Sequence, residues 1–136
     1  MRSVLVFDPG ESTGWMYEDD NILSGGTAGK DHREIAKLIR TLAPQVVVYE
    51  SFKLYPGKAK SLSWNSFYPV EVIGVIKYIC LDKNIEMVEQ APHVKKFAGG
   101  FDTAWESFKA NVRVTEHTKD AYLHLRYYKR NKKERP

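Results

Sequence analysis

Two short apolar runs, each ending in a carboxylate, constrain the fold of this chain more than any other feature. Residues 4–7 read Val-Leu-Val-Phe and precede Asp8, and residues 45–50 read Gln-Val-Val-Val-Tyr-Glu and end in Glu50. Uninterrupted apolar runs of this length, rich in β-branched residues, are typical of strands buried on both faces of a sheet. We therefore expect two central strands with an acidic side chain at each carboxyl end.

The remaining sequence supplies neighbours for these strands. Residues 13–17 and 22–27 read as strands that flank the polar turn Asp19-Asp20-Asn21 and form hairpins with the first strand. Asp31 is a good helix N-cap, and Pro44 ends that helix. Further along we expect a helix over residues 69–82, a short strand over 85–88, a brief helix over 92–97 and a last helix over 115–129. Residues 101–114 are ambiguous.

This order, βββαβαβα, implies an α/β fold with a mixed five-stranded sheet flanked by helices. The length of 136 residues suits one domain, which we place at residues 1–130. Residues 131–136 are expected to form a flexible basic tail.

Composition narrows the functional classes. The net charge is +4, and residues 119–136 hold seven Lys or Arg against two acidic residues, which favours a polyanionic partner. A single cysteine, Cys80, excludes an intramolecular disulfide and a cysteine-rich zinc site, and it suits the reducing cytoplasm. No apolar run approaches the roughly 20 residues of a membrane helix, and the start of the chain lacks a signal-peptide layout.

Four polar side chains form the candidate site. In the expected sheet the first and fourth strands are parallel neighbours, so Asp8 and Glu50 would lie side by side. His117 and Asp120 are three residues apart and share one face of the last helix, which can bring them to the same point. Taken alone, each has an ordinary structural explanation as a turn former, a strand tip or a surface pair. Their combination, on this topology, predicts a functional cluster.

Clustered carboxylates repel one another unless a cation is present. Oxygen ligands with at most one imidazole suit Mg²⁺ or Mn²⁺, and two such ions about 4 Å apart can stabilise both the attacking and the leaving oxygen in phosphodiester cleavage. We therefore predict Asp8, Glu50, His117 and Asp120 as catalytic residues and as ligands of two ions. His124, one turn beyond Asp120, could support this site or serve the fold, whereas His32 and His93 fit surface roles.

The same residues lie in segments that resemble the RuvC-type Holliday-junction resolvases, in particular the compact phage-encoded branch. The resemblance covers most of the chain and rests on four segments in order: Val-Phe-Asp8-Pro-Gly-Glu-Ser-Thr-Gly14-Trp, Val-Val-Val-Tyr-Glu50, Pro92-His-Val-Lys95-Lys96-Phe-Ala-Gly-Gly100 and His117-Thr-Lys-Asp120-Ala-Tyr-Leu-His. Residues 101–114 depart from the family's glycine-rich pattern, and the loop after Glu50 is longer and more aromatic.

The resemblance implies an RNase H-like fold, a homodimer and two-metal hydrolysis of branched DNA that leaves a 5′-phosphate and a 3′-hydroxyl. The family's catalytic acids fall on Asp8, Glu50 and Asp120. His117 stands where the family often has another aspartate, and a neutral imidazole there would favour Mn²⁺. The helix over residues 69–82 has an apolar surface wider than core packing requires, so we expect it to form the dimer contact. Roles in DNA recombination and repair, in a bacterial or phage-infected cell, follow from the same resemblance.

Residues 52–68 have no periodicity and are interpreted as a functional loop. Phosphate contacts are expected from its lysines and from the later lysine pair: Lys53, Lys58, Lys60, Lys95 and Lys96. The aromatic side chains of Phe52 and Tyr55 could stack on an unpaired base or anchor the loop in the core, and both readings stay open.

Three alternatives remain at this point. The chain could be a non-cleaving module that binds branched nucleic acid, or a ribonuclease H-type enzyme acting on RNA–DNA hybrids. An actin-like phosphotransferase is the third, because Asp8-Pro-Gly-x-x-Thr13-Gly14 resembles a phosphate loop, although that class needs two such domains.

Overall fold

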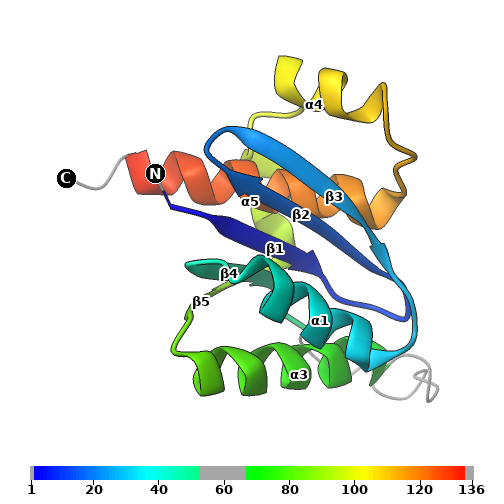
Figure 1. Ribbon diagram of the computed structural model, residues 1–136. Helices are drawn as coiled ribbons and strands as arrows, with labels where there is room; N and C mark the ends of the chain where they lie inside the picture. The colour runs from blue at the N-terminus through cyan, green and yellow to red at the C-terminus, as the bar shows by residue number, and fades with distance from the viewer. Residues whose placement is uncertain (1, 53–66, 134–136) are drawn as a thin grey trace.

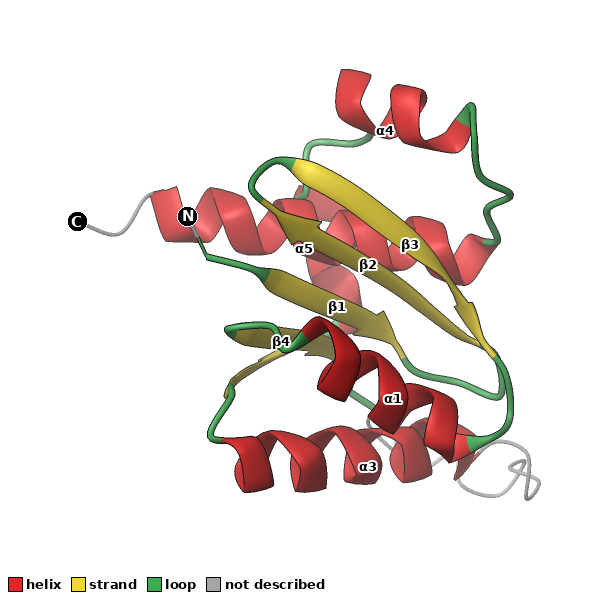
Figure 2. Ribbon diagram, in the orientation of Figure 1, coloured by secondary structure: helices red, strands yellow, loops and turns green. Residues whose placement is uncertain are grey.

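The computed structural model describes residues 2–52 and 67–133, with side chains described as far as residue 131. Its centre is a five-stranded mixed sheet in the order β3-β2-β1-β4-β5 (Figures 1 and 2). The strands are β1 (Val4–Asp8), β2 (Thr13–Asp19), β3 (Ile22–Ala28), β4 (Val46–Glu50) and β5 (Glu86–Gln90). The first three strands pair antiparallel, whereas β1–β4 and β4–β5 are parallel. The predicted α/β fold with a mixed five-stranded sheet is therefore confirmed.

Both faces of the central strands are buried, as the apolar runs predict. On β1, Leu5 and Phe7 belong to one core cluster, while Val4 and Val6 belong to the cluster on the opposite face. This alternation follows from the two-residue period of a strand. Each face of the sheet therefore needs its own layer of helices.

One face is covered by α1 (His32–Leu42) and α3 (Tyr68–Lys83), which also pack against each other (Figure 1). Asp31 caps α1, since its side chain accepts a hydrogen bond from the backbone N–H of Arg33. Glu34 accepts from the backbone N–H of Gly29, two residues before the cap. Ala43 in the left-handed region ends the helix ahead of Pro44.

The opposite face is covered by the long helix α5 (Glu116–Lys133), with the short helix α4 (Thr103–Lys109) at its edge. The ambiguous segment 101–114 thus contains a helix. Asp102 begins it by accepting from the backbone N–H of Trp105, whose indole is buried among Phe101, Phe108 and Tyr122. A seven-residue helix is too short for a clear apolar period, which is why its pattern gave no assignment.

The expected short helix over residues 92–97 is the 3₁₀-helix η2 (Pro92–Phe97). Element ends differ from expectation by a few residues: β5 begins and ends later, and α5 continues to Lys133, into the segment expected to be a tail. No helix in residues 2–52 and 67–133 is both long and apolar enough to cross a membrane.

Candidate active site

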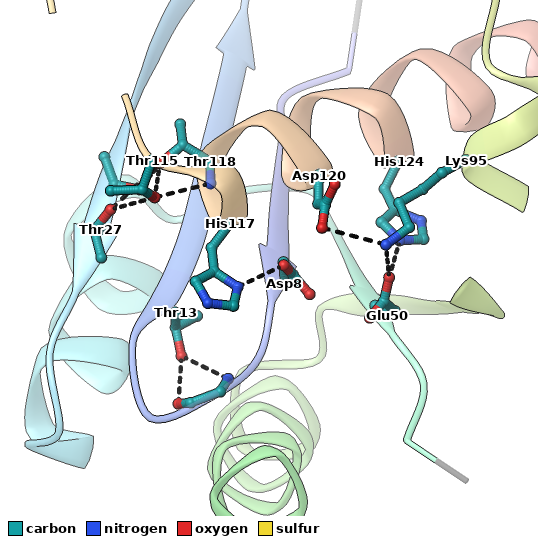
Figure 3. A network of polar contacts seen from close by, with 12 residues as sticks. Asp8, Thr13, Thr27, Glu50, Lys95, Thr115, His117, Thr118, Asp120 and His124 are labelled. Carbon is teal, nitrogen blue, oxygen red and sulfur yellow. Dashed lines mark hydrogen bonds and ion pairs between the residues drawn. The ribbon is translucent and has the colours of Figure 1, made fainter. Parts of the chain in front are cut away.

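The four predicted site residues gather at one edge of the sheet. Because β1 and β4 are parallel, with Phe7 opposite Tyr49, their carboxyl ends present Asp8 and Glu50 side by side. The first turns of α5 cross this edge and bring His117 and Asp120 to it (Figure 3). The fold therefore brings together four side chains that are spread over more than a hundred residues of the sequence.

Asp8 and His117 are in direct contact. The Nδ1 atom of His117 lies 2.9 Å from Oδ2 of Asp8. The Asp8 side chain is 6% exposed, whereas the His117 ring is 47% exposed. The pair therefore joins a buried carboxylate to an imidazole that faces outward.

Glu50 is held by two donors on the same oxygen. The ammonium of Lys95 and the Nε2 atom of His124 each lie 2.9 Å from Oε1 of Glu50 (Figure 3). His124 is fully buried, and its Nδ1 atom lies 2.7 Å from Oε1 of Gln90 at the end of β5. His124, which the sequence left open, thus links the ends of two strands and orients Glu50.

Asp120 shares the same lysine. The ammonium of Lys95 lies 3.3 Å from Oδ2 of Asp120, so it bridges the acids contributed by β4 and α5. Lys95 comes from η2 and was predicted from sequence to contact DNA phosphate. In this structure its partners are two acids of the candidate site.

The electrostatics of the two buried acids differ. Burial, followed by the nearby charge of Glu50, raises the pKa of Asp8 from 3.8 to about 6, despite the opposing contact with His117. Burial also disfavours the charged form of Glu50, but hydrogen bonds from His124 and Lys95 outweigh it and lower its pKa to about 2. Negative charge is thus stabilised at Glu50 and poorly compensated at Asp8.

The Asp8-Pro-Gly-x-x-Thr13-Gly14 motif has a structural explanation. The Thr13 hydroxyl lies 3.2 Å from both the N–H and the carbonyl of Gly10, which closes the turn behind Asp8. At Gly14 a β-carbon would overlap the backbone of His117 and Thr118. Glycine at this position therefore allows α5 to approach the sheet closely enough to place His117 on Asp8.

Threonine hydroxyls fix the start of α5. Thr115 accepts from the backbone N–H of Thr118 at 3.3 Å, and Thr118 donates to the carbonyl of Gly26 at 2.9 Å. Thr27 of β3 contacts both hydroxyls. This network ties the helix end that bears His117 to the hairpin. The signal in the sequence that could have revealed this role is the Thr-x-x-Thr pair, because a threonine at a helix start is a common capping residue.

The donor set suits a hard divalent cation, although the side chains are not arranged around one. Among residues 2–52 and 67–131, no three His, Cys, Asp or Glu side chains form a group that could hold a metal ion. The carboxylates of the site instead contact cationic or imidazole side chains: Asp8 contacts His117, Glu50 contacts His124, and Asp120 contacts Lys95. The chemistry still fits, because Asp8, Glu50 and Asp120 supply carboxylate oxygens, and burial together with the charges of the other two acids raises the pKa of Asp8.

The other residues predicted to bind DNA lie in three different situations. Phe52 is half-buried and packs against the core beneath α1 and α3, which fits the anchoring alternative. Lys96 is exposed on η2. Lys53, Tyr55, Lys58 and Lys60 lie outside the described residues.

Comparison with known proteins places the fold. No protein-family model matches the chain, and no curated protein matches it in sequence. Among solved structures it is similar to Thermus thermophilus RuvC in complex with a Holliday junction substrate, with a TM-score of 0.69, 14% identity and 96% of each chain covered. The fowlpox virus Holliday junction resolvase gives 0.61, 13% identity and coverage of 95% of this chain and 99% of that one.

The yeast mitochondrial Holliday junction resolvase Ydc2 is similar over 97% of this chain and 81% of its own, with a TM-score of 0.58 and 10% identity. The chain therefore has the fold of the RuvC-type resolvases over nearly its whole length. At these identities the likeness establishes the fold, and the assignment of the site depends on the residues themselves.

The close crossing at Gly14 can be tested with one methyl group. We expect Gly14→Ala to lower the free energy of unfolding by about 2–3 kcal/mol, because the added carbon meets backbone that cannot rotate away. Chemical denaturation measures this. Gly74→Ala is the matched control, since nothing lies within 4 Å of its new β-carbon, and alanine should stabilise α3 by about 0.5–1 kcal/mol. Equal effects of the two substitutions would contradict the crossing.

The raised pKa of Asp8 predicts that replacing its carboxylate will stabilise the protein in a pH-dependent way. A folded pKa of about 6 against 3.8 means that the wild type loses stability as pH rises from about 4 to about 6. Without metal, Asp8→Asn should therefore be more stable than the wild type above pH 6, by up to about 3 kcal/mol at about 1.4 kcal/mol per pK unit. The difference should vanish below about pH 4. Denaturation between pH 4 and 8 in chelator measures it.

Asp31→Asn is the control with the opposite sign. Hydrogen bonds from Arg33 lower the pKa of Asp31 to about 2, so its ionised form stabilises the protein above about pH 4. Its replacement should destabilise the protein at neutral pH. An Asp8→Asn variant that is also less stable than the wild type at pH 7 would show that Asp8 is not electrostatically strained.

Proposed function

We propose that this chain is a metal-dependent, structure-selective endonuclease that resolves Holliday junctions. The observation that carries the proposal is the convergence of Asp8, Glu50, His117 and Asp120 at one sheet edge. This convergence occurs in a fold shared with resolvase structures over nearly the whole chain. Neither the acids alone nor the fold alone would specify the chemistry.

Asp8, Glu50, Asp120 and His117 would hold two Mg²⁺ or Mn²⁺ ions. When bound, the metal supplies Lewis-acid stabilisation of the oxygens on either side of the phosphorus in an in-line displacement. Water is the nucleophile, and the products are a 5′-phosphate and a 3′-hydroxyl.

The chain's own residues provide placement. His124 holds Oε1 of Glu50 from the core, and in the protein without metal Lys95 contacts the same oxygen. His117 holds Asp8 through Nδ1. Oriented acids are what two-metal hydrolysis needs, because misplacement by about 1 Å can cost about a hundredfold in rate.

Charge favours a nucleic-acid substrate. The net charge of +4 and the basic residues of α5 would offset phosphate repulsion by the acidic site. Lys96, exposed on the 3₁₀-helix beside Lys95, is a candidate phosphate contact. Branched DNA is the substrate class that the similar structures favour, since one of them is a RuvC complex with a Holliday junction.

The alternatives make different predictions. A non-cleaving module would bind junctions with or without metal and would not nick them, and a ribonuclease H-type enzyme would prefer an RNA–DNA hybrid. The actin-like reading loses support from the turn after Asp8, because the Thr13 hydroxyl is already engaged with Gly10. A substrate panel of four-way junction, splayed arm, linear duplex and hybrid separates these activities.

We expect Asp120→Asn to bind a four-way junction and to lose several orders of magnitude in cleavage rate, because one charged ligand is removed while the shape is kept. Gel-based nicking and mobility-shift assays in Mg²⁺ or Mn²⁺ measure the two properties. Asp20→Asn, in the exposed turn between β2 and β3, is the matched control and should cleave normally. Cleavage by Asp120→Asn at the wild-type rate, or by the wild type in chelator, would refute the proposal.

We further propose that two copies pair through α3. Its inner face packs in the core, while Val70, Tyr78 and Leu81 are 48%, 67% and 69% exposed. Their spacing of eight and three residues places them on one side of the helix. A second copy is the partner that the function requires, because resolution of a four-way junction needs two cuts at symmetric positions and one chain provides one site.

Leu81→Glu should convert the dimer to a monomer with little effect on the fold, because this exposed side chain would bury a charge only in the interface. Sedimentation velocity at micromolar concentration measures the change. Ile22→Glu, at a similarly exposed apolar position in the hairpin of β2 and β3, should leave the dimer intact. A monomeric wild type would contradict the interface.

A further inference from the structure

Lys95 occupies the place where a cation is needed. Its ammonium lies 2.9 Å from Oε1 of Glu50 and 3.3 Å from Oδ2 of Asp120. Figure 3 shows the amino group between the two acids, with the His124 ring beside it at the same oxygen of Glu50. One side chain thus balances two carboxylates that come from different layers of the fold.

This contact has a clear energetic reason. The side chains of Glu50 and Asp120 are only 17% and 34% exposed, and that of Lys95 is 23% exposed. Partly buried like charges at short range repel one another more strongly than they would in water. The ammonium relieves that repulsion by the same Coulombic attraction that a divalent ion would use.

The backbone at Lys95 is held in place, while its side chain can change conformation. Val94 and Ala98 on either side of it are buried, and Arg130 donates to the carbonyl of Phe97 at 2.8 Å, which ties this segment to α5. The four-carbon stem of a lysine is flexible and its ammonium is compact. The ammonium can therefore leave the carboxylates without any change in η2.

We propose that Lys95 is a built-in competitor for the metal at Glu50 and Asp120, so that an ion can load only when the ammonium moves away. This inference rests on the proposed function for the identity of the metal site. Lys95 then acts as a positioning residue that holds the acids in place until the ion arrives. Its presence makes ion binding weaker than the four ligands alone would allow.

Two variants of one residue test the competition. Lys95→Met removes the charge and keeps the length, so it should bind Mn²⁺ about tenfold more tightly, within the usual range for coupled binding events. Lys95→Arg keeps the charge and adds a bidentate grip on carboxylates, so it should bind Mn²⁺ more weakly than the wild type. Calorimetric titration of each free protein with Mn²⁺, without DNA, measures the order.

Lys96→Met is the matched control. This neighbouring lysine is exposed on the same 3₁₀-helix and contacts none of the site acids. Its Mn²⁺ affinity should equal that of the wild type. A second readout is thermal stability in chelator, which Lys95→Met should lower and Mn²⁺ should restore, because the acids then lack any other cation.

Each outcome decides the inference. Equal Mn²⁺ affinity in Lys95→Met, Lys96→Met and the wild type would overturn it, as would a Lys95→Arg variant that binds as tightly as the wild type. If Lys95→Met does not fold without metal, the Lys95→Arg comparison still decides. These titrations contain no DNA, so they test the competition separately from cleavage. If the Mn²⁺ affinities follow the predicted order but the protein cuts no junction, the proposed function is refuted and the competition stands.

Discussion

The close crossing of α5 over β2 is the constraint on which the site depends. At Gly14 there is no room for a β-carbon beside the backbone of His117 and Thr118. Threonine hydroxyls from β3 and α5 fix the same crossing. A helix held further from the sheet would carry His117 away from Asp8 and Asp120 away from Lys95, so this single contact positions two of the four candidate ligands.

Glu50 and Asp8 differ in how well their surroundings stabilise a negative charge. Hydrogen bonds from two donors outweigh burial at Glu50 and lower its pKa, whereas burial and the charges of two nearby acids raise the pKa of Asp8 despite its imidazole partner. Such uncompensated charge reduces stability, and a natural protein retains it where function requires it. The electrostatic strain is therefore located at Asp8, the most buried of the acids.

The sequence predicted the sheet and the convergence of Asp8, Glu50, His117 and Asp120, because these follow from local patterns and one topological rule. Apolar runs mark buried strands, and parallel neighbours bring their ends together. The sequence did not predict that Lys95 would bridge Glu50 and Asp120. These partners lie 45 and 25 positions from Lys95, and the contacts depend on how η2 packs against α5. The helix within residues 101–114 was missed because seven residues show no clear period.

The candidate site joins the two ends of the chain. Asp8 lies in the first strand, and its partner His117 follows 109 positions later in the last helix. During synthesis the sheet strands leave the ribosome well before α5, so no partial product can contain the complete cluster. The four candidate site residues can therefore converge only after α5 has been made and has docked on the sheet.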